Sequence, residues 1–244
     1  MSWLRDFRFA MRHADQWRIY ADFLNDRYQQ HNLARLRHLA GLKLNIDGKR
    51  VLEVGAGIGD HTLFYLYRNC DILPTDGRVE NVAFMRKRLG IRAEVLDPER
   101  QPEALTAHGK FDILHCYGFL YHIQNPEVFL EYAARTARSI FLETCVSFGH
   151  DAQKNLVDEP AEVFSQAMHG KGCRPTRRWV FEALQQHYKY VYSTRTQPRH
   201  EEFPTEWDKP FSNSNQLTRA VFIASHDPVD SDQVLTELPL RYAH

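Results

Sequence analysis

The chain lacks the features that would direct it to a charged partner or a membrane. Its 31 basic and 31 acidic side chains give a formal net charge of zero, so no overall field draws it to nucleic acid or to an anionic lipid surface. Charge interrupts the N-terminus at Arg5 and Asp6, too early for a secretory signal, and no run approaches the roughly 18 apolar residues of a membrane span. We expect a cytoplasmic protein without a membrane span.

Cysteine and metal-binding patterns are also sparse. The four cysteines Cys70, Cys116, Cys145 and Cys173 are far apart, and none belongs to a CxxC or Cys/His spacing. The histidines show no HxH or HExxH pattern, which is the spacing of many metal sites. The sequence therefore predicts free thiols and no metal site.

The composition is that of a globular protein, and the pattern along the chain is that of an α/β fold. Apolar residues make up 43% of the 244 residues, enough for one large core. From Trp3 to Leu44 apolar residues recur at helical spacing, which predicts a helical leader; from Lys49 short apolar runs alternate with helix-length segments, which is typical of βα units and a mostly parallel sheet. We expect strands at 50–55, 71–75, 91–96, 111–117 and 139–145, with helices near 58–69, 78–89, 99–108 and 125–138.

The alternation breaks after Cys145. The segment 150–174 has no clear strand and reads as a lid, and beyond it we expect a helix at 177–187 and strands at 188–196 and 217–225. The loop 197–216 separates these two strands, and a tail begins at Pro228. We interpret 1–244 as a single domain with a leader (1–46), a cofactor-binding core (47–147), a lid and acceptor-side half (148–227) and a tail (228–244).

The first expected strand leads into a glycine-rich turn, Glu53–Gly59 (EVGAGIG). Such a turn brings bare backbone against a ligand at a helix N-terminus. The dinucleotide fingerprint needs a third glycine at position 60, where this chain has Asp60, and the carboxylates of Glu53 and Asp60 would oppose a pyrophosphate. The turn favours a cationic cofactor without phosphate.

The segment Val51–Gly59 resembles the first motif of class I S-adenosylmethionine-dependent methyltransferases. The resemblance implies that the turn holds the methionine portion of the cofactor, that Asp76 binds the ribose and that Asp97 lies on the adenine side. It implies a sheet of seven strands, mostly parallel, with helices on both faces and its last strand antiparallel. We also expect the leader and the lid to meet over the carboxyl edge of this sheet. The implied cofactor-binding residues are Glu53, Gly55, Ala56, Gly57, Gly59, Asp76, Asp97, Cys116 and Tyr117.

Candidate catalytic residues follow the fourth strand. The Gly-x-Leu-Tyr-His segment beginning at Gly118 resembles one found in the tRNA wobble-uridine methyltransferase branch. His122 is our candidate general base, because imidazole titrates near neutral pH; alternatively it bonds to the lid or caps the next helix. Tyr121 could orient the methyl donor or acceptor, or its ring could simply pack.

Candidate substrate-binding residues are mostly arginines. If Thr176 caps the following helix, Arg177 and Arg178 lie in its first turn, where cations oppose the helix dipole. With Arg174 they could hold an anionic or polyhydroxylated substrate, or be solvated and paired with acids such as Glu201 and Glu202. Other acceptor-side candidates are Glu143, which could instead cap a helix or anchor the lid, and the aromatic residues Phe203 and Trp207, which could instead pack in the core.

The resulting hypothesis is an S-adenosylmethionine-dependent methyltransferase that acts on a small-molecule or glycan-like acceptor, at oxygen. An RNA-modifying transferase stays open because the leader is rich in arginine, although zero net charge argues against nucleic acid. A catalytically silent cofactor-binding partner subunit is a third interpretation. The sequence predicts no oligomeric state. The leader arginines are Arg5, Arg8, Arg12, Arg18, Arg35 and Arg37.

Overall fold

The computed structural model describes residues 18–19, 21–163, 165–209 and 217–243. The leader before residue 18, with Arg5, Arg8 and Arg12, lies outside the described residues. Its remainder contains helix α2 (Asp26–Gly41), which begins where the Asn25 side chain accepts a hydrogen bond from the Tyr28 amide. This part of the leader is helical, as predicted.

In the described part of the chain, eight strands form one sheet in the order β10-β8-β9-β5-β4-β1-β2-β3. The strands β1 to β5 pair in parallel, whereas β9 runs antiparallel between β5 and β8. The predicted reversal of the last long strand is therefore confirmed. The bounds are β1 (Arg50–Val54), β2 (Asp71–Asp76), β3 (Glu94–Val95), β4 (Phe111–Tyr117), β5 (Ala137–Cys145), β8 (Tyr190–Thr194), β9 (Arg219–Ser225) and β10 (Val234–Leu235).

Three short strands differ from the sequence prediction. The tail contributes β10, which pairs antiparallel with β8 and gives the sheet an eighth strand instead of the seven expected. Within the predicted lid, β6 (Leu156–Asp158) and β7 (Lys171–Cys173) form a separate antiparallel ribbon. Strands of two or three residues are too short to carry a periodic signal, so the sequence could not predict them.

Helices lie between the strands near the predicted positions. Of the stretch predicted to be helical at 99–108, residues 102–108 form a 3₁₀ helix, which starts at Pro102. Helix α6 begins at the predicted cap, since the Thr176 hydroxyl accepts a hydrogen bond from the Trp179 amide. The elements are α3 (Thr62–Leu66), α4 (Val79–Leu89), η1 (Pro102–His108), η2 (Leu120–His122), α5 (Pro126–Thr136) and α6 (Arg177–Gln185).

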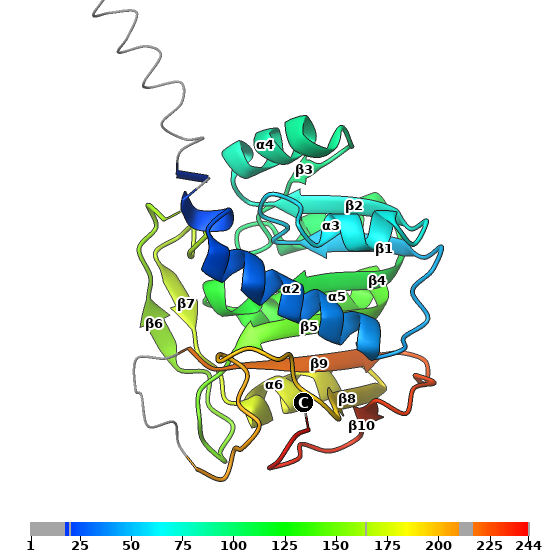
Figure 1. Cartoon of the computed structure of the whole chain (residues 1–244), viewed down its shortest axis with the longest axis vertical. Helices are drawn as coiled ribbons and strands as arrows, with labels where there is room; N and C mark the ends of the chain where they lie inside the picture. Colours follow the sequence, from blue (N-terminus) through cyan, green and yellow to red (C-terminus); the bar gives the residue numbers. More distant parts are fainter. Residues whose placement is uncertain (1–17, 20, 164, 210–216, 244) are drawn as a thin grey trace, which may run out of the picture.

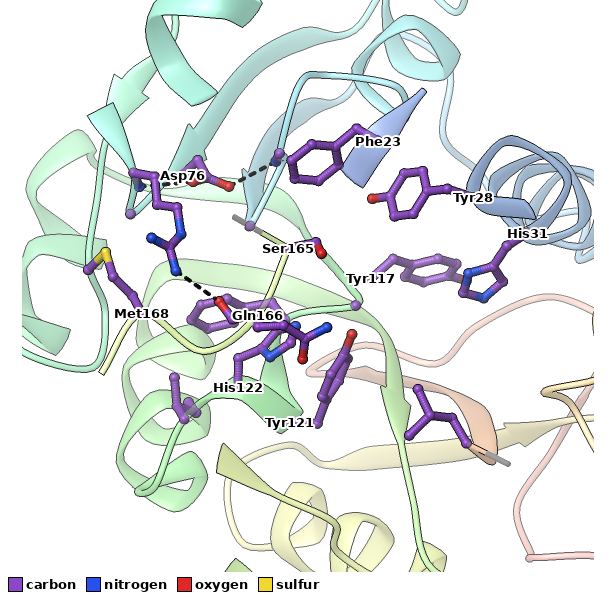
Figure 2. Close-up of a pocket in the computed structure, with 18 of the residues that line it drawn as sticks. Phe23, Tyr28, His31, Asp76, Tyr117, Tyr121, His122, Ser165, Gln166 and Met168 are labelled. Atoms are coloured by element: carbon purple, nitrogen blue, oxygen red, sulfur yellow. Dashed lines mark hydrogen bonds between the residues drawn. The ribbon is translucent and has the colours of Figure 1, made fainter. Parts of the chain in front are cut away.

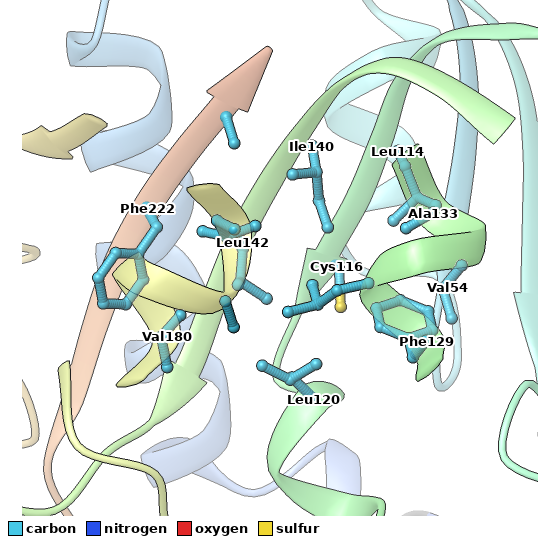
Figure 3. Close-up of a cluster of buried hydrophobic side chains, with 14 of the residues drawn as sticks. Val54, Leu114, Cys116, Leu120, Phe129, Ala133, Ile140, Leu142, Val180 and Phe222 are labelled. Carbon is cyan, nitrogen blue, oxygen red and sulfur yellow. The ribbon is translucent and has the colours of Figure 1, made fainter. Parts of the chain in front are cut away.

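Alternate side chains of the central strands build a core on each face of the sheet. On one face, Leu114 and Leu142 pack with α5 and α6 through Phe129 and Val180 (Figure 3). On the other, strand residues such as Phe141 pack against α2 and α3. Figure 1 shows α2 crossing the sheet over β4 and β5. Leu39 of α2 is fully buried in this second cluster, and burying one large apolar side chain contributes about 1.5–3 kcal/mol, so α2 is part of the folded core.

The four cysteines are buried and unpaired, as predicted. Among the residues that the structure describes, no helix has both the length and the hydropathy to cross a bilayer.

Candidate functional site

A cavity of about 320 Å³ lies where β1, β2 and β4 reach their carboxyl ends. Ligands bind at this edge in open α/β sheets. Helix α2 and the segment between β6 and β7 complete its walls, and Figure 2 shows Tyr28 and His31 on the opposite side from Asp76 and Met168. The predicted site residues that line it are Gly55, Gly57, Asp76, Asp97, Tyr117, Tyr121 and His122.

The glycine turn requires its first two glycines. Gly55 and Gly57 have φ angles of 71° and 56°, which non-glycine residues rarely adopt. A Cβ on Gly55 would lie 2.8 Å from Phe119 Cβ, and one on Gly57 would lie 2.9 Å from Phe23 Cε1. The turn therefore fits closely between the segment after β4 and the leader.

Asp76 joins this turn to the start of α4. Its carboxylate accepts hydrogen bonds from the Gly57 amide (2.9 Å), the Arg78 amide (2.9 Å) and Asn81 Nδ2 (3.1 Å). Burial raises the pKa of Asp76, and these three donors act in the opposite direction. The carboxylate is thus fixed in the cavity wall beside the glycine turn.

The lid is held against the side of the cavity formed by β2 and β3. Arg78 Nη2 donates to the backbone carbonyls of Ala161 (2.8 Å), Val163 (3.1 Å) and Gln166 (3.3 Å). Asp97 Oδ2 lies 2.8 Å from His169 Nε2. Through these contacts the lid adds four wall residues that the sequence did not single out: Ser165, Gln166, Met168 and His169.

The other residues expected at the cofactor do not line the cavity. Glu53 is 2% exposed, accepts a hydrogen bond from the Thr62 hydroxyl at 2.6 Å, and burial raises its pKa to about 8. Ala56 donates its amide to the Thr75 carbonyl, Gly59 packs against α4, and Cys116 is buried in the core. These residues shape the turn and the strand beneath it.

His122 is held by the lid. Its Nδ1 lies 2.5 Å from Glu159 Oε2, and Glu159 also contacts Arg174 Nη2 at 2.7 Å and the Ala167 amide at 2.8 Å. Burial would raise the pKa of Glu159, but His122 and Arg174 lower it to about 2; burial lowers the pKa of His122. A neutral His122 donates from Nδ1 to this carboxylate, which leaves the Nε2 lone pair free to accept a proton.

Tyr121 lies between two guanidinium groups. Its hydroxyl accepts a hydrogen bond from Arg219 Nη2 at 3.2 Å, and Arg174 and Arg219 lie 5.0 and 4.9 Å from its ring centroid. Burial raises the pKa of Tyr121, with Arg219 acting against it. The side chain stays a neutral phenol that can donate its proton to a ligand.

Glu143 lies behind the cavity wall rather than in it. Its fully buried carboxylate bridges Arg35 (2.9 Å), from α2, and Arg219 (3.1 Å), from β9. Both arginines line the cavity. Glu143 therefore fixes two cationic wall residues that come from distant parts of the sequence.

None of the three arginines predicted at the substrate lines the cavity. Arg174 binds Glu159, and Arg178 is exposed and pairs with Glu182 at 2.7 Å. Arg177 is buried, donates to the Pro239 carbonyl and lies 4.1 Å from the Trp207 ring centroid. Both cations in the first turn of α6 therefore have partners within the protein.

Several cavity residues were missed by sequence reasoning. Tyr28, His31 and Arg35 share one face of α2 and line the cavity, a set that their three- and four-residue spacing could have indicated. No local sequence pattern indicated that Arg219 and Glu202 would line the cavity. Phe203 and Trp207 are buried and do not line the cavity. The structure therefore agrees with the alternative that these two side chains pack in the protein interior.

Comparison with known families finds that residues 25–196 match the family model described as a methyltransferase domain. No curated protein matches the sequence. Among solved structures, the N-terminal domain of EvdMO1, crystallised in the presence of S-adenosylhomocysteine (SAH) and D-fucose, is 22% identical with a TM-score of 0.60, over 82% of this chain and 84% of that one. A Burkholderia thailandensis 1,6-didemethyltoxoflavin-N1-methyltransferase, with its substrate and SAH, is 18% identical with a TM-score of 0.50, over 91% and 85%. At these identities the likeness establishes a shared fold.

Proposed function

Since the chain belongs to the methyltransferase domain family and its cofactor is S-adenosylmethionine, we propose that it methylates an oxygen atom of a small or glycan-like acceptor. The observation that carries this proposal is the His122–Glu159 pair at the cavity wall. A hydroxyl acceptor must lose a proton when it is methylated, and this pair can take it.

The cavity wall fits the cofactor. We assign the methionine portion to the bare backbone at Gly55 and Gly57, the ribose to Asp76 and the adenine side to Asp97. Asp76 accepts three hydrogen bonds from the protein, and a carboxylate has about four acceptor sites, which leaves one for a ribose hydroxyl. When bound, S-adenosylmethionine supplies an electrophilic methyl group attached to a sulfonium.

His122 acts as general base in this proposal. Its Nε2 accepts the acceptor's hydroxyl proton, and the negative charge of Glu159 stabilises the imidazolium that forms. Arg174 and the Ala167 amide hold Glu159 in place. The Tyr121 hydroxyl accepts a hydrogen bond from Arg219. In this proposal it also donates a hydrogen bond to a second oxygen of the substrate and so orients the substrate.

The chemistry of the wall supports a hydroxyl-rich acceptor. The cavity offers polar groups such as Gln166, Glu202 and Arg219, and convergent polar groups in a pocket fix the orientation of a ligand. Because the cofactor occupies part of the same cavity of about 320 Å³, the room that remains favours a small molecule or a single terminal sugar residue as the acceptor. The N-terminal domain of EvdMO1, which shares this fold, was crystallised in the presence of D-fucose, and this supports a sugar-like acceptor here.

The test is a methyl-transfer assay with monosaccharides, disaccharides and small aryl alcohols, in which mass spectrometry and NMR locate the methyl group. We expect an O-methylated product, and we expect His122→Asn to lower kcat by about 10²–10⁴-fold while SAH affinity by calorimetry stays unchanged. His187→Asn, outside the cavity, is the matched control.

An unchanged kcat in His122→Asn would remove the general base. A product methylated at nitrogen or carbon would refute the proposed oxygen acceptor. A chain that binds SAH but turns over no acceptor would support the catalytically silent partner subunit instead.

A further inference from the structure

We infer that His31, His200 and Glu202 form a binding site for a first-row transition metal dication at the edge of the cavity. One potential ligand atom from each residue lies within 4.8 Å of those from the other two. His31 belongs to α2, while His200 and Glu202 belong to the loop after β8. His31 and Glu202 also line the cavity, so an ion held here would face a bound acceptor.

His31 presents an unsatisfied nitrogen to this site. Among the residues that the structure describes, its buried Nε2 has no hydrogen-bond partner; it lies 3.9 Å from Glu202 Oε2, and the side chain is 7% exposed. A buried polar group without a partner costs about 1–3 kcal/mol. An ion bound at this site would supply the missing partner of this nitrogen.

His200 completes the imidazole pair. Its ring centroid lies 4.7 Å from that of His31, with the two planes inclined by 32°. One ligand atom from each ring and one from the Glu202 carboxylate lie within 4.8 Å of one another, so a shift of about an ångström or two brings all three within bonding distance of an ion.

The Glu202 carboxylate is oriented by a second layer of contacts. Its Oε2 accepts a hydrogen bond from Arg219 Nε at 2.6 Å, and Arg219 is itself paired with Glu143. Partners of this kind fix metal-binding carboxylates. The neighbouring Arg27, which contacts Oε1 at 3.3 Å, is 71% exposed, so solvent screens its charge.

The donor set and the charge balance define the ion and its remaining ligand. Two imidazoles and one carboxylate suit Zn²⁺, Co²⁺, Ni²⁺, Fe²⁺ or Mn²⁺ better than Mg²⁺ or Ca²⁺, which prefer oxygen. Arg35 and Arg219 already balance Glu143 and Glu202. A dication therefore calls for an anionic oxygen from the cavity as a further ligand, which an acceptor can supply.

The inference goes beyond methyl transfer, because metal binding is measured without any acceptor. The full chain, dialysed against a chelator, is titrated with Co²⁺ and followed by its visible absorption, and Zn²⁺ binding is measured by calorimetry. We expect one equivalent of each ion to bind. Glu202→Gln and His200→Ala should weaken binding by more than roughly tenfold, whereas His150→Ala, on an exposed histidine, should not.

SAH binding is measured on every variant, and retained SAH affinity shows that the fold is intact. His200→Ala is the decisive variant, because His200 is only partly buried and its loss leaves the Arg219–Glu202 pair in place. The absence of metal binding by the wild-type chain, or His200→Ala binding Co²⁺ as tightly as the wild type, would overturn the inference.

Discussion

At the scale of single residues, Glu159 determines what His122 can do. A carboxylate accepts but does not donate hydrogen bonds, so in a neutral imidazole it keeps the proton on Nδ1 and the lone pair on Nε2. Two further donors, Arg174 and the Ala167 amide, hold Glu159 in place, and His122 and Arg174 lower its pKa. The lid therefore contributes to the proposed chemistry as well as covering the cavity.

We predict that Glu159→Gln lowers kcat and moves the acid limb of the pH–activity profile to lower pH. Burial lowers the pKa of His122 and Glu159 raises it, so removing the carboxylate lets the pKa fall further. Activity that needs neutral His122 then persists to lower pH, although the imidazolium formed in the reaction is less stable. The profile of kcat/KM against pH, with Glu182→Gln as a surface control, checks this; an unmoved limb would assign Glu159 a purely structural role.

We predict that Asp76→Asn weakens SAH binding by at least about tenfold, because hydrogen bonds to a charged group contribute about 1.5–3 kcal/mol. The variant also removes one of the acceptor oxygens that receive the Gly57 amide, Arg78 amide and Asn81. Calorimetric titration measures the change. Asp71→Asn, an exposed position at the other end of β2, is the control, and equal affinities in the two variants would contradict the ribose assignment.

At the scale of elements, predictability depended on local signals. The strand and turn around Gly55 have a run of apolar residues and a glycine pattern, and the Thr176 cap precedes an amphipathic helix, so both were predicted. The ribbon of β6 and β7 and the edge strand β10 have neither. Their positions depend on which neighbour pairs with them, and that information lies elsewhere in the chain.

We predict that Leu142→Ala in β5 lowers the free energy of unfolding by about 2–5 kcal/mol, the usual effect of truncating a fully buried leucine. Leu142 is 0% exposed and packs in the core between the sheet and helices α5 and α6. Val128→Ala, on the exposed face of α5, should change it by less than about 1 kcal/mol. Urea unfolding measures both, and equal effects would contradict the core packing described above.

At the scale of the whole molecule, the site is assembled from both ends of the chain. Cofactor-side residues follow one another along β1, β2 and β4, so the sequence indicated Gly55, Asp76 and Tyr117. The opposite wall joins Arg35 of the leader to Arg219 of β9 through Glu143. Such a long-range pairing leaves no spacing signal, which is why Glu143 was predicted as an acceptor contact and Arg219 was not predicted.

We predict that the protein loses stability as the pH falls from 7 to 5. Burial holds the pKa values of several histidines below 6.5. Once the pH drops below 6.5, the unfolded chain therefore binds more protons than the folded chain. Each such extra proton lowers the free energy of unfolding by about 1.4 kcal/mol per pH unit. The pKa of Glu53, raised to about 8, has the opposite effect, since the folded chain keeps a proton that the unfolded chain loses above its ordinary pKa. The histidines are more numerous: His31, His38, His61, His115 and His122.

Thermal unfolding at pH 7, 6 and 5 measures this dependence. The melting temperature should fall with each step, and His38→Gln, which removes a histidine whose pKa burial lowers to about 4, should flatten the dependence. A melting temperature that rises toward pH 5 would show that Glu53 outweighs the histidines.

The Arg35–Glu143–Arg219 network also sets the order in which a newly made chain can complete its pocket. Synthesis proceeds at about 5–20 residues per second from the N-terminus, so the leader leaves the ribosome well before Arg219 exists. Until then the Glu143 carboxylate can pair with the Arg35 guanidinium, but its second partner, the Arg219 guanidinium, has not yet been made. The cofactor half can form early, whereas the acceptor wall closes only when nearly the whole chain has been made.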